Sequence, residues 1–295
     1  MNSVWAVVVT HNRRDKLPRC LGALAVQHRR PDRVLVVDNA STDGTREMLE
    51  RDYGEVEVLA LRRNEGGAGG FHEGMKHAHG AGAVWLWLMD DDTVPEPGAL
   101  AELLSASELS RTPEGACEAA LLASKVIWRD GSPHPLNFPT LERRRMDLVI
   151  TGAELGLLPM RAATFVSLLV HRRAIDSYHL PLKHYFLWSD DIEYTSRVVL
   201  GGERAWFVPS SVVLHDTAAP EDFMSALPDR FYYHARNTLM MAAAPGRPLR
   251  DRLLRIWLSL STAARYVARN RDRASAAAVA RAVADALRET LNARA

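Results

Sequence analysis

Short apolar runs alternate with segments of helical periodicity through the N-terminal part of the chain. The runs are rich in Val, Leu and Trp, which is typical of strands that helices cover on both faces of a parallel sheet. We expect these strands at 4–9, 33–37, 56–61 and 83–89. We expect helices around 17–24, after 41–44 and over 71–79, the last of which follows a glycine-rich loop at 64–70. The pattern predicts an α/β fold.

The middle of the chain is less regular, and the composition changes towards the C-terminus. Further strands are expected at 126–128, 165–170, 205–208 and 212–214, and a further helix at 187–200. Beyond Pro220 the sequence is rich in Ala, Leu and Arg with helical periodicity. We therefore place a domain boundary near residue 217, between an α/β domain at 1–217 and a helical C-terminal extension at 218–295.

The formal net charge of +1 is unevenly distributed along the 295 residues. Residues 247–295 contain 11 Arg and four acids, a charge of +7, which leaves 1 − 7 = −6 for the rest. A basic segment on an acidic body is typical of a contact with an anionic surface. Because Leu254, Trp257 and Leu258 recur at helical spacing among arginines, we expect 247–273 to lie on an anionic membrane. Packing on the body or in a homo-oligomer is the alternative.

The cysteine count and the length of the apolar stretches argue against a disulfide-stabilised protein and against a membrane-spanning one. Two cysteines, Cys20 and Cys117, provide no disulfide framework and favour a reducing compartment, so we expect both in the core. The N-terminus has no basic region before its first apolar run, and the longest apolar stretch, 81–89, is far below the roughly 20 residues that cross a bilayer. We expect a cytoplasmic protein.

Polar residues follow four of the expected strands. They are Thr10 and His11, Asp38, Asn64, and the triplet Asp90, Asp91 and Asp92. The carboxyl ends of parallel strands meet at one edge of a sheet, where ligands bind, so we expect these residues to lie together. Three adjacent carboxylates repel one another unless a cation is near, and the triplet therefore favours a Mg²⁺ or Mn²⁺ site that would hold substrate phosphates. Ordinary turns are the alternative for each segment.

The glycine-rich segment 64–70 does not match the dinucleotide fingerprint GxGxxG. With Gly67 and Gly69 as the first two glycines, the third position is His72. This argues against a Rossmann dehydrogenase. The segment would still let the backbone near Gly67 approach a nucleotide closely, and a plain turn is the alternative.

Two acids, Asp190 and Asp191, begin the helix expected at 187–200, and capping explains only one of them. A second carboxylate beside the ring of Trp188 has the chemistry of a general base that removes a proton from a sugar hydroxyl. His215 follows an apolar strand and would complete a metal site with the acid triplet. We expect no functional role for the remaining histidines, His134 and His234 among them.

Several segments together resemble the inverting, metal-dependent nucleotide-sugar glycosyltransferases of family 2, which have the GT-A fold. They are VVTHNR (8–13), VVDNASTDGT (36–45), NEGGAGGF (64–71), WLMDDD (87–92) and DDIEY (190–194). The resemblance covers about residues 3–217 and is greatest to the galactofuranosyltransferase branch, with rhamnosyltransferases close by. It implies a Rossmann-like, mostly parallel sheet flanked by helices.

The resemblance also implies a role for each motif residue. The donor side would comprise Thr10, His11, Asp38, Asn64, Gly67, Asp90 and Asp91; the metal ligands would be Asp90, Asp92 and His215; the base would be Asp191, with Trp188 and Asp190 on the acceptor side. His11 stands where the family commonly has Tyr, and the Trp-Ser-Asp-Asp element is one residue longer than its shortest form.

The activity implied is transfer of galactofuranose from UDP-galactofuranose to a hydroxyl group of a glycan or polyprenyl-linked acceptor, with Mn²⁺ or Mg²⁺ as cofactor. The alternatives are a dTDP-rhamnose-dependent rhamnosyltransferase and a noncatalytic nucleotide-sugar-binding scaffold recruited to membranes. Such a protein would act in the cytoplasm, on the inner face of the cell membrane, and no nucleic acid is expected as a partner.

Overall fold

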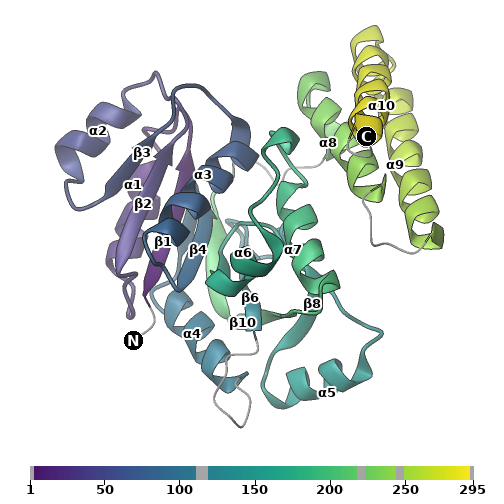
Figure 1. The fold of residues 1–295 in the computed structure, drawn as a ribbon. Helices are drawn as coiled ribbons and strands as arrows, with labels where there is room; N and C mark the ends of the chain where they lie inside the picture. Colours follow the sequence, from purple (N-terminus) through teal and green to yellow (C-terminus); the bar gives the residue numbers. More distant parts are fainter. Residues whose placement is uncertain (1–2, 111–118, 218–222, 244–248, 293–295) are drawn as a thin grey trace.

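The computed structural model describes residues 3–110, 119–217, 223–243 and 249–292 (Figure 1). Cys117 lies outside the described residues. A mixed sheet is flanked by helices, and three helices stand beside this body. Along the sheet the strand order is β3-β2-β1-β4-β9-β6-β10-β8-β7, and β5 pairs with β10. The strands are β1 (Val4–Thr10), β2 (Arg33–Asp38), β3 (Glu57–Ala60), β4 (Trp85–Asp90), β5 (Thr93–Pro95), β6 (Ala119–Ile127), β7 (Thr140–Leu141), β8 (Leu158–Ala162), β9 (Leu168–His171) and β10 (Arg204–His215).

The N-terminal half of the sheet is parallel, as the apolar pattern predicted. β1 pairs with β2 and β4, and its register sets Thr10 beside Asp38 and Val9 beside Asp90. Alternate residues of β1 point to opposite faces, where they pack with helices on both sides of the sheet. The helices of this half are α1 (Leu17–Ala25), α2 (Thr45–Asp52), α3 (Gly66–Gly80) and α4 (Ala99–Leu109). Polar strand ends therefore meet at one edge of the sheet.

The second half of the sheet is mixed because β9 runs antiparallel to both β4 and β6. The apolar pattern located this buried strand but carried no information about its direction. The two strands expected near the end of the body form one strand, β10, with a register shift between Val208 and Val212. The helices here are α5 (Met146–Glu154), α6 (Arg172–Tyr178), η1 (Lys183–Tyr185) and α7 (Asp190–Leu200).

The expectation of a loop at 64–70 is wrong from Gly66 onward, because α3 begins there. These glycines let the helix lie directly against the sheet. A Cβ atom on Gly70 would lie 2.4 Å from Cγ1 of Val9, and one on Gly74 would lie 2.6 Å from Cγ1 of Val7. The glycine run therefore serves close packing between helix and strand, which brings the first turn of α3 to the ligand edge.

The C-terminal helices form a small bundle with its own core. They are α8 (Pro228–Ala243), α9 (Leu249–Asn270) and α10 (Arg273–Asn292), and the short 3-10 turn η2 (Phe223–Ser225) precedes them. Phe231 of α8 stacks on Tyr266 of α9 with ring centroids 3.5 Å apart, and Ala263 and Ala282 complete the core. Among the described helices, none is both long and apolar enough to cross a membrane.

Candidate active site

A cavity of about 580 Å³ opens at the carboxyl ends of β1 and β4. It brings together every residue predicted for the site except Asp38. The predicted residues that line it are Thr10, His11, Asn64, Gly67, Asp90, Asp91, Asp92, Trp188, Asp190, Asp191 and His215. Segments far apart in the sequence thus form one cavity wall, because β4 and β10 both deliver their polar ends to this edge.

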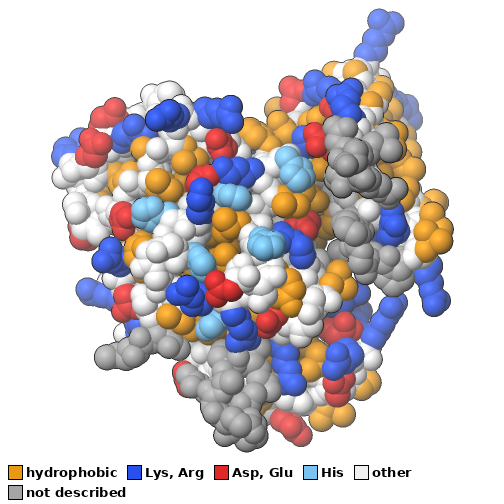
Figure 2. Space-filling model, viewed as in Figure 1, with side chains coloured by type: hydrophobic (Ala, Val, Ile, Leu, Met, Phe, Trp, Pro, Cys, Tyr) orange, Lys and Arg blue, Asp and Glu red, His pale blue; other side chains and the backbone are white. Residues whose placement is uncertain are grey.

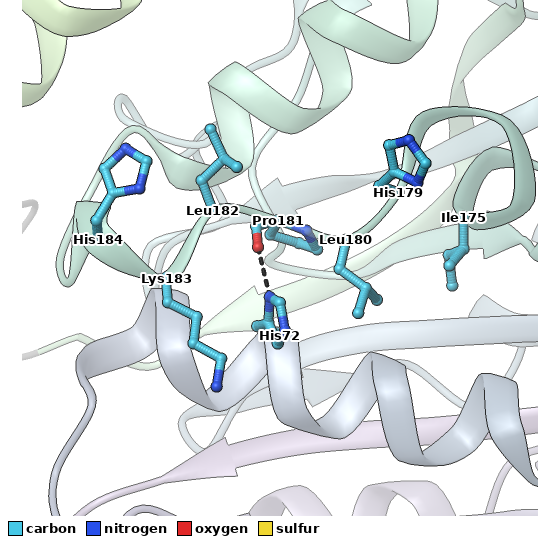
Figure 3. Close-up of a pocket in the computed structure, with 8 residues that line it drawn as sticks. All are labelled: His72, Ile175, His179, Leu180, Pro181, Leu182, Lys183 and His184. Carbon is cyan, nitrogen blue, oxygen red and sulfur yellow. Dashed lines mark hydrogen bonds between the residues drawn. The ribbon is translucent and has the colours of Figure 1, made fainter. Parts of the chain in front are cut away.

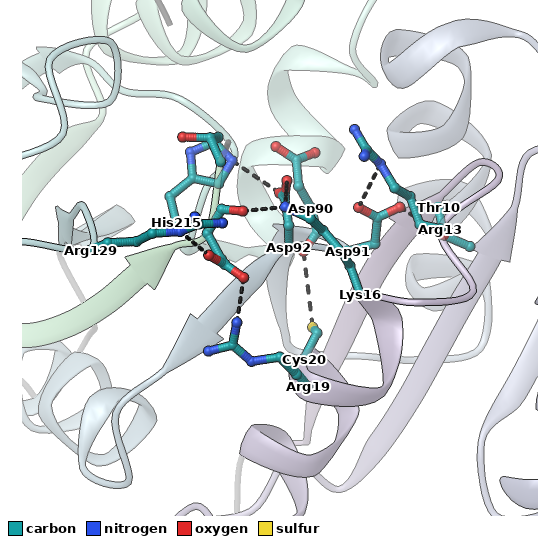
Figure 4. Close-up of polar contacts among 12 residues, drawn as sticks. Thr10, Arg13, Lys16, Arg19, Cys20, Asp90, Asp91, Asp92, Arg129 and His215 are labelled. Atoms are coloured by element: carbon teal, nitrogen blue, oxygen red, sulfur yellow. Dashed lines mark hydrogen bonds and ion pairs between the residues drawn. The ribbon is translucent and has the colours of Figure 1, made fainter. Parts of the chain in front are cut away.

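Asp90, Asp92 and His215 form a cluster suited to a divalent cation (Figure 4). One ligand atom from each residue lies within 4.8 Å of the others. Nε2 of His215 lies 3.1 Å from Oδ1 of Asp92, and its Nδ1 contacts Asn137. Two carboxylates and an imidazole match the ligand preferences of Mn²⁺, and the two carboxylates also suit Mg²⁺.

Basic residues of the β1–α1 segment face the acid triplet. Nε of Arg13 lies 3.9 Å from Asp91, and Nζ of Lys16 lies 3.7 Å from Asp92. Burial alone would raise the pKa of Asp92, but the hydrogen bond and charge of His215 and the charge of Lys16 lower it overall. Asp91 behaves differently: burial and repulsion from its acidic neighbours raise its pKa to about 7, while Thr10 donates a hydrogen bond to it at 2.7 Å. The triplet therefore divides into two carboxylates that form the cluster with His215 and one carboxyl held by β1.

A second group of charged side chains supports the end of β10 beside this cluster, and Figure 4 labels Lys16, Arg19 and Arg129 of this group. Asp216 pairs with Arg19 of α1 and with Arg129, and Lys16 donates to its carbonyl oxygen. The backbone N–H of Asp216 donates to the carbonyl of Asp92 at 2.9 Å. These contacts tie the segment that carries His215 to the acid triplet.

Asparagine side chains hold the first turn of α3 at the wall of the cavity. Asn39 accepts from the Glu65 N–H and donates to the Gly66 carbonyl, both at 2.8 Å, and Asn64 accepts from the Gly66 N–H at 2.8 Å. Helix N-termini present unpaired N–H groups that attract anions. The arrangement places Gly67 in the cavity wall, where a nucleotide could contact the backbone.

Asp38 lies beside the cavity rather than in its wall. Its buried carboxylate accepts from the backbone of Ser41 at 3.0 Å and pairs with Arg46 at 2.9 Å. Through these contacts it holds the turn that leads into α2.

Asp190 and Asp191 form the first turn of α7 and face the same cavity. The side chain of Ser189, the N-cap residue, makes no capping hydrogen bond, whereas Oδ1 of Asp191 accepts from the neighbouring Ile192 N–H at 2.7 Å. Burial raises the pKa of Asp191 to about 7, with a contribution from the charge of Asp90. Burial and the charge of Asp191 raise the pKa of Asp190 well above its ordinary value. A carboxyl whose pKa lies near neutrality is suited to general base catalysis.

The structure corrects the expectation that His134 and His234 have no place in the site. His134 lies against His215, with ring centroids 4.9 Å apart, and both histidines line the cavity. His234 comes from α8, where burial lowers its pKa to about 4 and keeps the ring neutral. No local pattern around either residue distinguished it from a structural histidine.

Helix α8 and the turn η2 also contribute to the cavity wall. Phe223 packs edge-on against Trp188 at 5.3 Å and stacks on His234 at 4.2 Å, while the guanidinium of Arg230 lies 5.1 Å from the centre of the Trp188 ring. Residues on both sides of position 217 therefore build one site. Periodicity predicted the helix but not this contact.

A second, open pocket lies between α3 and the segment that follows α6 (Figure 3). His72, His179 and Lys183 line it together with apolar residues, and Nδ1 of His72 contacts the Pro181 carbonyl at 2.7 Å. None of the residues predicted for the site lines this pocket.

Comparisons with known proteins agree with this geometry. Residues 5–136 match Glycosyl transferase family 2. The chain is 32% identical over 274 residues to galactofuranosyltransferase GlfT1 of Mycobacterium tuberculosis. The aligned residues cover 87% of this chain and 86% of the relative. It is 29% identical over 237 residues to the N-acetylglucosaminyl-diphospho-decaprenol L-rhamnosyltransferase of the same species, covering 72% of this chain and 75% of that one.

A solved structure shares the fold. S. aureus TarS 1-349 in complex with UDP-GlcNAc superposes with a TM-score of 0.61 at 17% identity, covering 88% of this chain and 72% of that one. A longer TarS chain is covered over only 39% of its length. The sheet with flanking helices is thus the GT-A fold expected from the sequence. Family match, relatives and fold agree: the chain is a glycosyltransferase and belongs to glycosyl transferase family 2.

Proposed function

We propose that this glycosyltransferase moves galactofuranose from UDP-galactofuranose to a hydroxyl group of a polyprenyl-linked glycan. The observation that carries the proposal is that Asp191, with a pKa near 7, lines the same cavity as the cluster Asp90, Asp92 and His215. The relative named galactofuranosyltransferase GlfT1 supports the choice of sugar. The relative named for N-acetylglucosaminyl-diphospho-decaprenol supports a lipid-linked acceptor.

In the proposed reaction, Asp191 accepts the proton of the acceptor hydroxyl as its oxygen attacks the anomeric carbon of the donor. The new glycosidic bond forms while the bond from that carbon to the diphosphate oxygen breaks, and UDP leaves with the bonding electrons. Attack opposite the leaving group inverts the anomeric carbon. A divalent ion bound by Asp90, Asp92 and His215 would neutralise charge on the diphosphate. Thr10, Asn64 and the first turn of α3 would bind the nucleotide.

A dTDP-rhamnose donor is the second candidate, favoured by the rhamnosyltransferase relative. A donor panel distinguishes the two. Purified protein is incubated with UDP-galactofuranose, UDP-glucose, UDP-GlcNAc or dTDP-rhamnose, each with Mn²⁺, Mg²⁺ or a chelator, and release of free nucleotide is measured. Turnover of UDP-galactofuranose above the others supports the proposal. Preference for dTDP-rhamnose overturns the sugar assignment, and turnover of neither UDP-galactofuranose nor dTDP-rhamnose overturns both candidates.

We further infer that α9 places the enzyme on an anionic membrane, on the cytoplasmic face where a lipid-linked acceptor would be reached. The inner face of α9 packs on α8 through Ala263 and Tyr266. Its outer face leaves large apolar side chains exposed, with Leu253 at 57% and Trp257 at 64%. Figure 2 shows hydrophobic and basic side chains together along the outer edge of the C-terminal helices.

The charge of the segment supports a lipid surface, rather than a second copy of the chain, as the partner of this face. The segment 247–295 has a formal charge of +7, so two copies that met through this face would repel each other. An anionic leaflet attracts it, at about 1 kcal/mol for each Arg near the surface. Leu253, Trp257 and neighbouring Leu residues would enter the headgroup region, with Arg250 and Arg265 beside them.

A further inference from the structure

The loop between η1 and α7 has an unusual backbone. Three of its non-glycine residues adopt left-handed conformations: Phe186 at φ 61°, Trp188 at φ 64° and Ser189 at φ 67°. Each such residue costs on the order of 1 kcal/mol, so the loop keeps this shape only if its surroundings hold it. The loop leads directly into Asp190 and Asp191 and presents Trp188 to the cavity.

Helix α8 holds the loop from one side through a single fully buried amide. Nδ2 of Asn237 lies within hydrogen-bond distance of three loop carbonyls, at 2.9 Å from Tyr185, 2.9 Å from Leu187 and 2.8 Å from Trp188. Nη2 of Arg236 adds bonds to the carbonyls of His184 and Tyr185, and its Nε donates to Oδ1 of Asn237 at 2.9 Å. Both polar atoms of the Asn237 amide are therefore used.

Helix α3 holds the loop from the opposite side. The carbonyl of Phe186 accepts from the N–H of Ala68 at 3.2 Å. The two backbones approach so closely that a Cβ atom on Gly66 would lie 2.0 Å from that carbonyl oxygen. The loop is thus fixed between the donor-side helix and the C-terminal extension.

We propose that Asn237 is a positioning residue for this loop and so for the groups that act on the acceptor. By holding three backbone carbonyls of the loop in place, the amide sets where Trp188 stands and where α7 begins. The C-terminal extension then belongs to the catalytic unit rather than being an appendage. The inference rests on the proposed function only in assigning Asp191 as the base.

The test compares Asn237→Asp and Asn237→Ala with the wild type, using the donor selected by the panel. Asn237→Asp keeps the side-chain shape but turns the donating nitrogen into an oxygen that faces carbonyl oxygens. We expect kcat to fall by about 10- to 100-fold in both variants, the scale for a misplaced catalytic group. UDP affinity, measured by calorimetry, and the donor KM should stay unchanged, because the donor side lies on α3. Asn270→Ala is the control, since among the described residues its Nδ2 bonds within α9, to the Tyr266 carbonyl at 3.1 Å.

Wild-type kcat in folded Asn237→Asp would overturn the proposal, as would a parallel loss of UDP affinity. If neither Asn237 variant folds, Arg236→Gln tests the proposal instead. This substitution removes the hydrogen bonds to the His184 and Tyr185 carbonyls, just before the same loop. A fall in kcat at unchanged UDP affinity would support the positioning role, and wild-type kcat would refute it. Asp191→Asn, assayed in parallel, tests the proposed base separately: full activity there would reject the base while leaving the Asn237 result standing.

Discussion

Nδ1 of His215 lies 2.9 Å from Oδ1 of Asn137. The Nδ2 atom of Asn137 donates to Oγ1 of Thr164 at 3.1 Å, so both polar atoms of the amide have a partner. An amide oxygen only accepts, so Nδ1 of His215 carries a proton. Nε2, which faces Asp92, is then the nitrogen that can bind a metal ion. Asn137 comes from the irregular middle segment, in which no sequence pattern marked it.

The first prediction follows from this contact. Replacing Asn137 with Ala frees the imidazole of His215 to rotate and to change tautomer. We expect the affinity for Mn²⁺ to fall by about 10- to 100-fold, the usual effect of losing a residue that orients a ligand. Binding of Mn²⁺ followed by electron paramagnetic resonance measures this without an activity assay. Unchanged Mn²⁺ affinity would contradict the assignment of His215 as a ligand.

The second prediction concerns the acid triplet. Asp92→Ala removes a carboxylate ligand, and we expect transfer to be abolished, as it should be in the wild type with excess chelator. Asp229→Ala is the matched control, because this exposed aspartate on α8 pairs only with Arg281 among its described salt bridges. Product formation with added Mn²⁺ or Mg²⁺ is the measurement. Full wild-type activity in chelator would show that no ion is required.

The third prediction concerns the proposed base. Asp191→Asn cannot accept a proton, so kcat should fall by about 10²-fold or more while UDP affinity persists. Asp190→Asn should lower kcat by a smaller factor. Because the carboxylate form is the active one and its pKa is about 7, wild-type kcat should rise with pH through neutrality and fall below it. A kcat profile that stays flat from acid to neutral pH would be inconsistent with this base.

The fourth prediction tests the membrane face. Full-length protein should co-sediment with vesicles containing anionic phosphatidylglycerol and should dissociate as salt is raised, since surface charge is screened. The double variant Leu253→Ser and Trp257→Ser should bind much less. Leu287→Ser, an exposed leucine on α10, should bind like the wild type. Equal binding of neutral and anionic vesicles would refute the inference, and a dimer that dissociates in the double variant would assign the face to self-association.

The fifth prediction is that alanine has opposite effects on stability at two glycines within helices. A Cβ atom added to Gly22 of α1 would have no neighbouring atom within 4 Å, so Gly22→Ala should stabilise the protein by about 0.5–1 kcal/mol. Gly70→Ala should destabilise it by about 1–3 kcal/mol, because the added methyl group meets Val9 of β1. Urea unfolding measures both changes. A stabilised Gly70→Ala variant would mean that α3 does not need its close approach to the sheet.

The sequence predicted the parts of the fold that depend on local pattern. Apolar runs that end in polar residues located β1 and β4, and the topology of parallel strands placed Thr10 and Asp90 at one edge. The direction of β9 and the helical state of 66–70 depend on pairing and packing partners elsewhere in the chain, which no local pattern contains. The same holds for Asn237, whose carbonyl partners lie about fifty residues earlier.

The wall of the cavity follows the order of the chain. One part of the wall comes from residues 9–92, and the rest comes mainly from residues 164–241. Under the proposed function, residues of the first stretch would contact the nucleotide and residues of the second would contact the acceptor. We therefore expect substitutions in the later stretch to change the acceptor while the donor stays the same, so that a relative diverging only in α8 would build a different glycan from the same activated sugar.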